Sequence, residues 1–146
     1  MEIAFLIVKV TKENQNIWAE LCVSLWPNHT AESFIQERNN NNYQNEFLFM
    51  VKDEAAAFIS LSLRNDYVEG TKTSPVGYLE GIYVKPKFRN QGIAKELVEY
   101  AKKWFAKKGC SELASDCLIE NEVSRKFHNR IGFKEVNTIV CFTMKI

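Results

Sequence analysis

The sequence predicts an α/β fold in which a mixed, mostly antiparallel central sheet is flanked by helices. Runs rich in β-forming residues alternate with amphipathic runs in the order β-α-α-β-β-β-α-β-α-β-β. The 146 residues, 46% of them hydrophobic and 25% charged, suit one globular domain with a sizeable core. Between residues 78 and 108 a strand, a basic loop containing glycine and a long helix follow one another. We therefore expect a single domain over residues 1–146.

The N-terminal part predicts one strand and two helices. Residues 3–10 form an apolar run that we interpret as a strand, because a basic region and a cleavage site typical of a signal peptide are lacking. A helix with apolar residues at spacing four begins within residues 11–14 and ends at Pro27. Thr30 is a suitable N-cap for a short second helix. The asparagine-rich residues 39–45 are then expected to form an exposed loop.

The middle of the chain predicts three strands. Residues 47–52 and 55–64 are rich in β-forming residues and are separated by Asp53 and Glu54, which indicates a hairpin. A turn-rich linker at 65–75 leads to a fourth strand at 77–84.

The C-terminal part predicts two helices and three strands. A long amphipathic helix spans about 92–108 and ends before Gly109, a suitable C-cap position. Residues 112–116 are expected to form a fifth strand and residues 121–131 a helix. Residues 133–136 and 139–145 are expected to form a final pair of strands.

Composition excludes several classes of function. A net charge of +1 provides no strong field for nucleic acid or an anionic membrane, so we expect neither as a partner. No apolar run approaches the roughly 20 residues that span a bilayer. The four cysteines lack CxxC spacing, so we expect reduced, mostly packed thiols in a cytoplasmic protein, with no metal and no disulfide. They are Cys22, Cys110, Cys117 and Cys141.

The stretch after the fourth strand has the features of a phosphate site. The first N–H groups of a helix lack partners within it, and the helix dipole favours an anion there. Arg89 and Lys95 add positive charge, and Gly92 lets an anion approach the backbone. On these residues alone, an ordinary turn between a strand and a helix remains an alternative.

The pattern Arg89-x-x-Gly92-x-Ala94 resembles the acyl-CoA pyrophosphate motif of the GNAT acetyltransferase superfamily, whose order of elements matches nearly the whole chain. Four further segments resemble the short Gram-negative branch of the aminoglycoside 6'-N-acetyltransferases. They are LWPNH (25–29), RNDYVEG (64–70), SPVGYLEGIYV (74–84) and ASD (114–116). The resemblance implies a bacterial, cytoplasmic antibiotic-resistance enzyme that uses acetyl-CoA and no metal. By analogy it also implies a homodimer, with the C-terminal strand as a candidate interface.

For the cofactor, the resemblance implies that backbone groups of the fourth strand polarise the thioester carbonyl and pair with the pantetheine arm. The backbone and charges of the following loop would hold the pyrophosphate. Asn121 would contact the pantetheine, act as a helix N-cap, or do both. The implied cofactor-binding residues are Ile82, Tyr83, Val84, Arg89, Asn90, Gln91, Gly92, Ile93, Ala94, Lys95 and Asn121.

For the acceptor amine, the sequence offers two acids, Glu80 and Asp116, in or beside apolar strands, where a carboxylate needs a partner. The resemblance implies that both bind substrate amines and that Asp116 is the base. It also implies that Trp26, Tyr67 and Asn137 bind substrate, although relatives place an acid at the last position. Acids in the implied site suit a polycationic aminoglycoside. They are Asp66, Glu69, Glu80, Asp116, Glu120 and Glu122, six of the chain's 18 acids.

Several alternatives remain open from sequence. Glu80 is either an acceptor ligand or a solvent-facing strand residue, and Asp116 either a base or a cap. His128 stands where many members of the superfamily have a tyrosine that protonates the leaving thiolate, and it either takes that role or packs. The acids also suit a GNAT enzyme acting on a polyamine, and an acyl-CoA sensor without activity is a further alternative.

Overall fold

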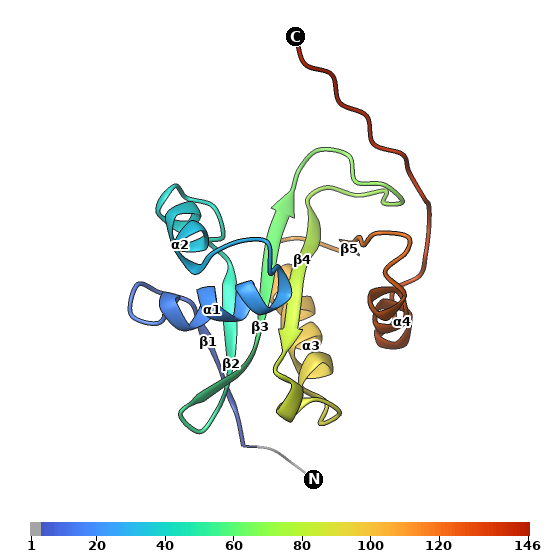
Figure 1. Cartoon of the computed structure of the whole chain (residues 1–146). Helices are drawn as coiled ribbons and strands as arrows, with labels where there is room; N and C mark the ends of the chain where they lie inside the picture. The colour runs from blue at the N-terminus through green and yellow to red at the C-terminus, as the bar shows by residue number, and fades with distance from the viewer. Residues whose placement is uncertain (1–3) are drawn as a thin grey trace.

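The computed structural model describes residues 4–146, and its centre is one sheet with strand order β1-β2-β3-β4-β5 (Figure 1). The strands are β1 (Leu6–Lys9), β2 (Glu46–Val51), β3 (Glu54–Arg64), β4 (Val76–Val84) and β5 (Leu113–Ser115). The first four pair in antiparallel fashion, and β5 pairs parallel to β4. The predicted fold class, a mixed and mostly antiparallel sheet with flanking helices, is confirmed.

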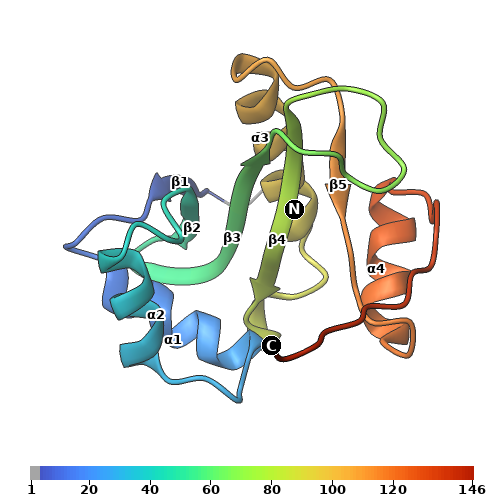
Figure 2. The same ribbon diagram turned by 90° about the horizontal axis from the view of Figure 1, so that it is seen from above.

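The helices cover both faces of this sheet. Figures 1 and 2 show α1 (Gln15–Leu25) and α2 (Ala31–Asn39) on one face, α3 (Ile93–Lys107) on the other, and α4 (Glu122–Ile131) beside β5. A short 3₁₀ helix, η1 (Pro86–Phe88), which the sequence did not indicate, lies between β4 and α3. Among the described residues, no helix is both long and apolar enough to cross a membrane.

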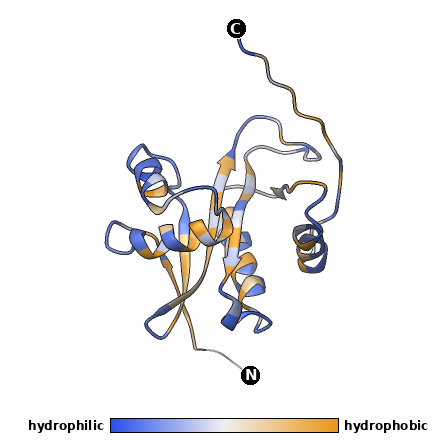
Figure 3. Cartoon of the chain, viewed as in Figure 1, coloured by the Kyte–Doolittle hydropathy of each residue, from blue (hydrophilic) through white to orange (hydrophobic). Residues whose placement is uncertain are grey.

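Alternation along the strands separates two cores. In β2, Phe47 and Phe49 pack under α3 with Leu97, whereas Leu48 lies between them and packs with Trp18 under α1 and α2. This period of two is what a strand buried on both faces requires. Figure 3 shows the resulting hydrophobic strands between helices whose outer surfaces are polar.

Most expected boundaries lie within one or two residues of the observed ones. Thr30 caps α2 as predicted, since its side chain accepts from the Ser33 backbone N–H at 3.1 Å. Strand β1 is shorter than the expected 3–10, and Ile3 lies outside the described residues. Two thiols, Cys117 and Cys141, are exposed, so the expectation of mostly packed cysteines is wrong for them.

The prediction of two final strands is wrong. Residues 133–146, which we call the C-terminal segment, contain neither helix nor strand and run away from the sheet (Figure 1). Their apolar side chains, such as Phe142 and Met144, are 88% exposed. Alternation of apolar and polar residues alone cannot form a strand, because a strand needs a hydrogen-bonded neighbour. Among the described residues, the C-terminal segment pairs with no strand.

Candidate active site

Strands β4 and β5 separate soon after they meet, and we call the point of separation the β4–β5 fork. They pair only from Gly77 to Leu79 and from Leu113 to Ser115, after which β5 ends and β4 continues to Val84. The Ser115 hydroxyl contacts the Leu79 carbonyl at 3.1 Å and closes the inner end of the fork. Within residues 4–146, no strand pairs with this edge of β4 beyond Leu79. Its backbone groups are therefore available to an extended ligand.

Glu80 occupies a β-bulge at the mouth of this fork. The pairing of β3 with β4 changes from Ser60↔Gly81 to Leu61↔Leu79, which leaves Glu80 as the extra residue of β4. A bulge re-aims side chains on the strand that carries it. As a result Leu79 and Ile82, three residues apart, both pack against the core beneath α3. The bulge thus explains how a strand whose first half is buried presents a carboxylate in its middle.

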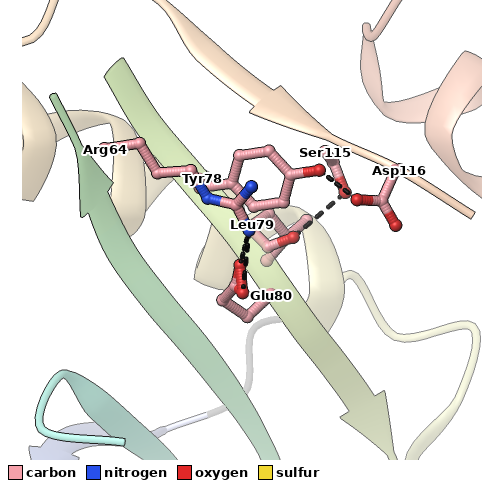
Figure 4. A network of polar contacts seen from close by, with 6 residues as sticks. All are labelled: Arg64, Tyr78, Leu79, Glu80, Ser115 and Asp116. Atoms are coloured by element: carbon pink, nitrogen blue, oxygen red, sulfur yellow. Dashed lines mark hydrogen bonds and ion pairs between the residues drawn. The ribbon is translucent and has the colours of Figure 1, made fainter. Parts of the chain in front are cut away.

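Four side chains form a connected group at the fork, which we call the acidic network (Figure 4). Arg64, at the end of β3, pairs with Glu80 through Nη2 and Oε1 at 2.6 Å. The Arg64 guanidinium carbon lies 3.4 Å from the centre of the Tyr78 ring. The Tyr78 hydroxyl donates a hydrogen bond to Oδ2 of Asp116. The two predicted acids are therefore linked, although Glu80 lies in β4 and Asp116 directly follows β5.

Arg64 and Tyr78 are the members of this network that sequence reasoning missed. Desolvation raises the pKa of Tyr78 well above its usual value, and the hydrogen bond to Asp116 adds to the effect. Tyr78 is therefore a permanent donor to Asp116 at ordinary pH. A signal was present in the sequence, since a cation ends the strand that precedes the acidic one, but pairing across strands is not visible without the register.

Trp26 lies against the bulge from the other side. It follows α1, and its ring packs beside Phe34 and Phe58. A Cβ added to Gly81 would lie 2.6 Å from the Trp26 ring, so only glycine leaves room for the indole there. Trp26 therefore packs against the core, and its ring lies against Gly81, the residue that follows Glu80 in β4.

The remaining predicted acceptor residues lie on loops beyond the fork. Tyr67 is 76% exposed in the 65–75 loop. Asn137 in the C-terminal segment donates a hydrogen bond to Glu69 of that loop. Glu122 lines a separate surface hollow with Arg125 and Glu135, away from the acidic network, so the six acids do not form one cluster.

Glu112 fixes the 65–75 loop to the start of β5. Its Oε1 accepts from the backbone N–H groups of Lys72 and Thr73, both at 2.8 Å, and from the Thr73 hydroxyl. These hydrogen bonds, the one from Thr73 above all, lower the pKa of Glu112. Sequence reasoning assigned no role to Glu112, because its partners lie some 40 residues away.

The loop between β4 and α3 has the backbone of an anion site. Asn90 and Gly92 adopt left-handed conformations with φ of 64° and 82°. Gly92 is the N-cap residue of α3, and a Cβ there would meet nothing within 4 Å, so the space above it is open. Arg89 turns back toward β4, and its Nε donates to the Val84 carbonyl at 2.8 Å. Lys85 and Lys87 both pair with Glu54.

Asn121 and His128 lie on α4, on the far side of the fork. Asn121 caps the helix by accepting from the Ser124 N–H at 3.1 Å, so its capping role is confirmed. His128 Nδ1 lies 2.7 Å from the Ser124 carbonyl, and Nε2 lies 2.8 Å from the Ser115 hydroxyl. Because a carbonyl only accepts, Nδ1 carries a proton, and Nε2 lies within hydrogen-bond distance of the same Ser115 hydroxyl that donates to the Leu79 carbonyl. His128 thus contacts the residue that closes the fork.

No group of three or more metal-ligating side chains is gathered among the residues that the structure describes.

Residues 11–133 match the sequence profile of the Acetyltransferase (GNAT) family. The chain is a GNAT acetyltransferase. The loop before α3 carries the Arg89-x-x-Gly92-x-Ala94 pattern, one of the sequence features on which the resemblance rested.

Relatives within the GNAT family are similar over almost their full length. Aminoglycoside N(6')-acetyltransferase type 1 of Salmonella enteritidis is 36% identical over 139 residues, 93% of this chain and 96% of that protein. The enzyme of the same name from Acinetobacter haemolyticus is 39% identical over 132 residues, 88% of this chain and 90% of its own. This GNAT protein therefore belongs to the aminoglycoside N(6')-acetyltransferase group.

A solved structure shows the same architecture. Aminoglycoside N-acetyltransferase AAC(6')-Iy in complex with CoA superposes with a TM-score of 0.92 at 33% identity, covering 100% of this chain and 98% of its own. The same enzyme with the bisubstrate analogue CoA-S-monomethyl-acetylneamine gives a TM-score of 0.89 at 33% identity, covering 98% and 99% of the two chains.

Proposed function

We propose that this GNAT protein is an aminoglycoside 6'-N-acetyltransferase that moves an acetyl group from acetyl-CoA to the 6'-amine and so confers resistance. The observation that carries the proposal is the fork. It brings two carboxylates, Glu80 and Asp116, beside a β4 edge that no described strand occupies. Relatives named for this activity at 36% and 39% identity support the same substrate class.

Acetyl-CoA would supply an activated acetyl thioester. We assign its pantetheine arm to backbone groups of Ile82, Tyr83 and Val84 along the open β4 edge, and to Asn121 across the fork. We assign its pyrophosphate to the N–H groups of residues 90–95 at the α3 N-terminus, where the dipole and Arg89 favour an anion. The left-handed φ of Gly92 and the open space above it fit a phosphate placed against the backbone.

The acidic network would receive the amine. A substrate ammonium must lose one proton before its nitrogen can form the new C–N bond. When the C–S bond then breaks, the CoA thiolate would take up the second proton that the nitrogen loses, so that the products are the amide and the CoA thiol. We assign the first proton to Asp116, with Glu80 holding the amine, directly or through a water. We place Trp26, Tyr67 and Asn137 against the sugar rings and hydroxyls. At Asn137, where relatives are expected to have an acid, a hydrogen bond replaces an ion pair and the contact is weaker.

We further propose that the protein is one acetyltransferase domain that acts in the cytoplasm as a homodimer. The C-terminal segment supports the dimer, because its large apolar side chains, such as Phe142, are exposed and would gain burial at an interface. Light scattering of the full chain and of a chain ending at residue 137 tests this. A monomeric full chain would exclude the dimer, and a dimeric truncated chain would exclude the segment as its interface.

A turnover screen tests the proposed function. Purified protein is incubated with acetyl-CoA and tobramycin, kanamycin or spermidine, and free thiol release is followed. Paromomycin, which has a hydroxyl at the 6' position, is the matched control. We expect turnover with tobramycin and kanamycin, a 6'-amide by mass spectrometry and NMR, and no product from paromomycin at that position.

The outcomes separate the alternatives. Turnover with spermidine alone would favour a polyamine acetyltransferase. Binding of acetyl-CoA without transfer to any amine would favour an acyl-CoA sensor. Absence of turnover with every 6'-amino aminoglycoside would exclude the proposed activity.

A further inference from the structure

The ion pair between Arg64 and Glu80 lies where the proposed function places the substrate amine, and the inference below depends on that function. Glu80 is the bulged carboxylate of β4, and in this structure its Oε1 is 2.6 Å from Arg64 Nη2, with Oε2 at 3.4 Å. An arriving ammonium and the guanidinium are both cations, so they compete for the same carboxylate. The free protein therefore already carries a mimic of its substrate's charge (Figure 4).

We propose that Arg64 is an internal counter-cation, which the substrate's ammonium displaces from Glu80 and which returns when acetylation removes that charge. Arg64 acts through Glu80 and is a positioning residue. Its guanidinium remains protonated at every working pH, so it always competes for the carboxylate. The acetylated nitrogen is a neutral amide, and a neutral amide competes poorly with a guanidinium for a carboxylate.

The geometry makes the exchange feasible. The Arg64 and Glu80 side chains are 43% and 28% exposed, and ion pairs with this much solvent access are weak. The guanidinium also has a second attachment, because its carbon lies 3.4 Å from the centre of the Tyr78 ring. It can release Glu80 and keep its cation–π contact with Tyr78, so displacement does not expel it into water.

The neighbouring charges determine whether removal of Arg64 strengthens or weakens substrate binding. Asp116 lies beyond Tyr78 and contacts the Tyr78 hydroxyl, not Arg64. Removing Arg64 therefore frees Glu80 and makes the site more negative, and both changes favour a polycation. If Arg64, as a weak partner, leaves Glu80 free about a quarter of the time, substrate affinity is reduced roughly fourfold by the pairing.

The test compares two substitutions that remove the same charge. Arg64→Gln removes the counter-cation, and Arg125→Gln removes an arginine that is paired with Glu135 outside the site. Tobramycin and enzymatically prepared 6'-N-acetyltobramycin are titrated into each full-length variant by calorimetry at fixed salt. We expect Arg64→Gln to bind tobramycin roughly fourfold more tightly than Arg125→Gln does, and to change affinity for the acetylated product much less. Arg64→Lys should resemble the parent.

A second pair of variants isolates the role of Glu80. In a Glu80→Gln background the competitor has no carboxylate to occupy, so adding Arg64→Gln should tighten tobramycin binding much less than it does in the parent, and what remains is the effect of removing one positive charge from the site. Equal effects of the two arginine substitutions in the parent would overturn the inference, as would equal tightening of substrate and product. A parent that binds but never acetylates tobramycin would remove the proposed function and, with it, this inference. If the parent acetylates tobramycin but Arg64→Gln does not bind tobramycin more tightly, only this inference is excluded.

Discussion

The Tyr78 hydroxyl donates its hydrogen bond to Oδ2 of Asp116 across the β4–β5 fork. Because burial and this hydrogen bond raise the pKa of Tyr78, the tyrosine cannot act as the acceptor of a proton from Asp116 at ordinary pH. One carboxylate oxygen is thus held in place, and the proposed function assigns the substrate's proton to the other, Oδ1. The arrangement orients the proposed base in the same way that a hydrogen-bonded partner orients a catalytic carboxylate in general.

Asp116→Asn should lower kcat roughly 100-fold, because the amide cannot accept the ammonium proton, whereas acetyl-CoA affinity should change little. Steady-state kinetics with tobramycin and direct titration of acetyl-CoA measure both. Activity equal to the parent would exclude Asp116 as the base.

Tyr78→Phe keeps the ring beneath Arg64 and removes the hydroxyl that holds Asp116. We expect a smaller fall in kcat than for Asp116→Asn, together with a loss of roughly 1–2 kcal/mol in the free energy of unfolding, as for a hydrogen bond to a charged group. Urea unfolding and kinetics on the same preparation check this. Identical effects of the two substitutions on kcat would mean that orientation, not proton transfer, is the main role of the pair.

Gly92→Ala should raise the KM for acetyl-CoA by roughly tenfold or more, because a Cβ would occupy the open space where we place the pyrophosphate. The KM for the aminoglycoside should stay the same. Gly109→Ala is a matched control, since Gly109 has a similar φ of 88° and open surroundings at the other end of α3. If both alanines raised the KM equally, backbone strain alone would explain the result.

Glu112→Gln should release the 65–75 loop, which carries Tyr67 and Glu69. A neutral amide accepts more weakly than the carboxylate that now receives hydrogen bonds from Lys72 and Thr73. We expect the aminoglycoside KM to rise roughly five- to tenfold, with the acetyl-CoA KM unchanged. Glu135→Gln, which removes an exposed carboxylate elsewhere, is the control. A rise in both KM values would indicate general destabilisation.

Glu46 gives the fold a dependence on pH. Its side chain is fully buried, and burial raises its pKa from 4.5 to about 7, opposed by the Ser60 hydroxyl, the Asn45 N–H and Arg38. The folded state therefore holds this proton more tightly than the unfolded state does. The stability that the protonated form contributes is complete below about pH 4.5 and is lost as pH rises through about 7.

Glu46→Gln should remove this loss, because glutamine stays neutral. Relative to the parent, we expect the variant to gain up to about 3 kcal/mol in free energy of unfolding between pH 5 and pH 8. Urea denaturation across this range measures the difference. A constant difference between the two proteins would show that Glu46 does not titrate in the folded state.

The order of elements could be predicted because it depends on local periodicity. Runs rich in β-forming residues marked β2 and β3, and apolar residues at spacing four marked α1 and α3. The bulge at Glu80 could not be predicted, because it is a mismatch of register between β3 and β4 and leaves no mark in either strand alone. The prediction of strands at residues 133–136 and 139–145 was wrong for a related reason, because a strand needs a neighbouring strand to pair with.

The candidate site was predictable where a single segment carries it. The loop at Gly92 and the N-cap at Asn121 depend on local backbone geometry alone, and the structure contains both. Arg64, Tyr78 and Glu112 act through contacts with distant residues, so their roles became visible only in three dimensions. Glu46 was assigned no role, because the loop was expected to end at residue 45 and the strand to begin at residue 47.

Trp26 lies on Gly81, next to the bulged Glu80, and is one of three tryptophans in the chain. Trp18 is fully buried beneath α2, and Trp104 lies on the opposite face of the sheet. Only one indole therefore borders the fork, where an arriving polycation would change the field around it. The fluorescence of Trp26 can therefore report occupancy of the fork without an added label. The emission of Trp18 and Trp104 would provide a constant background.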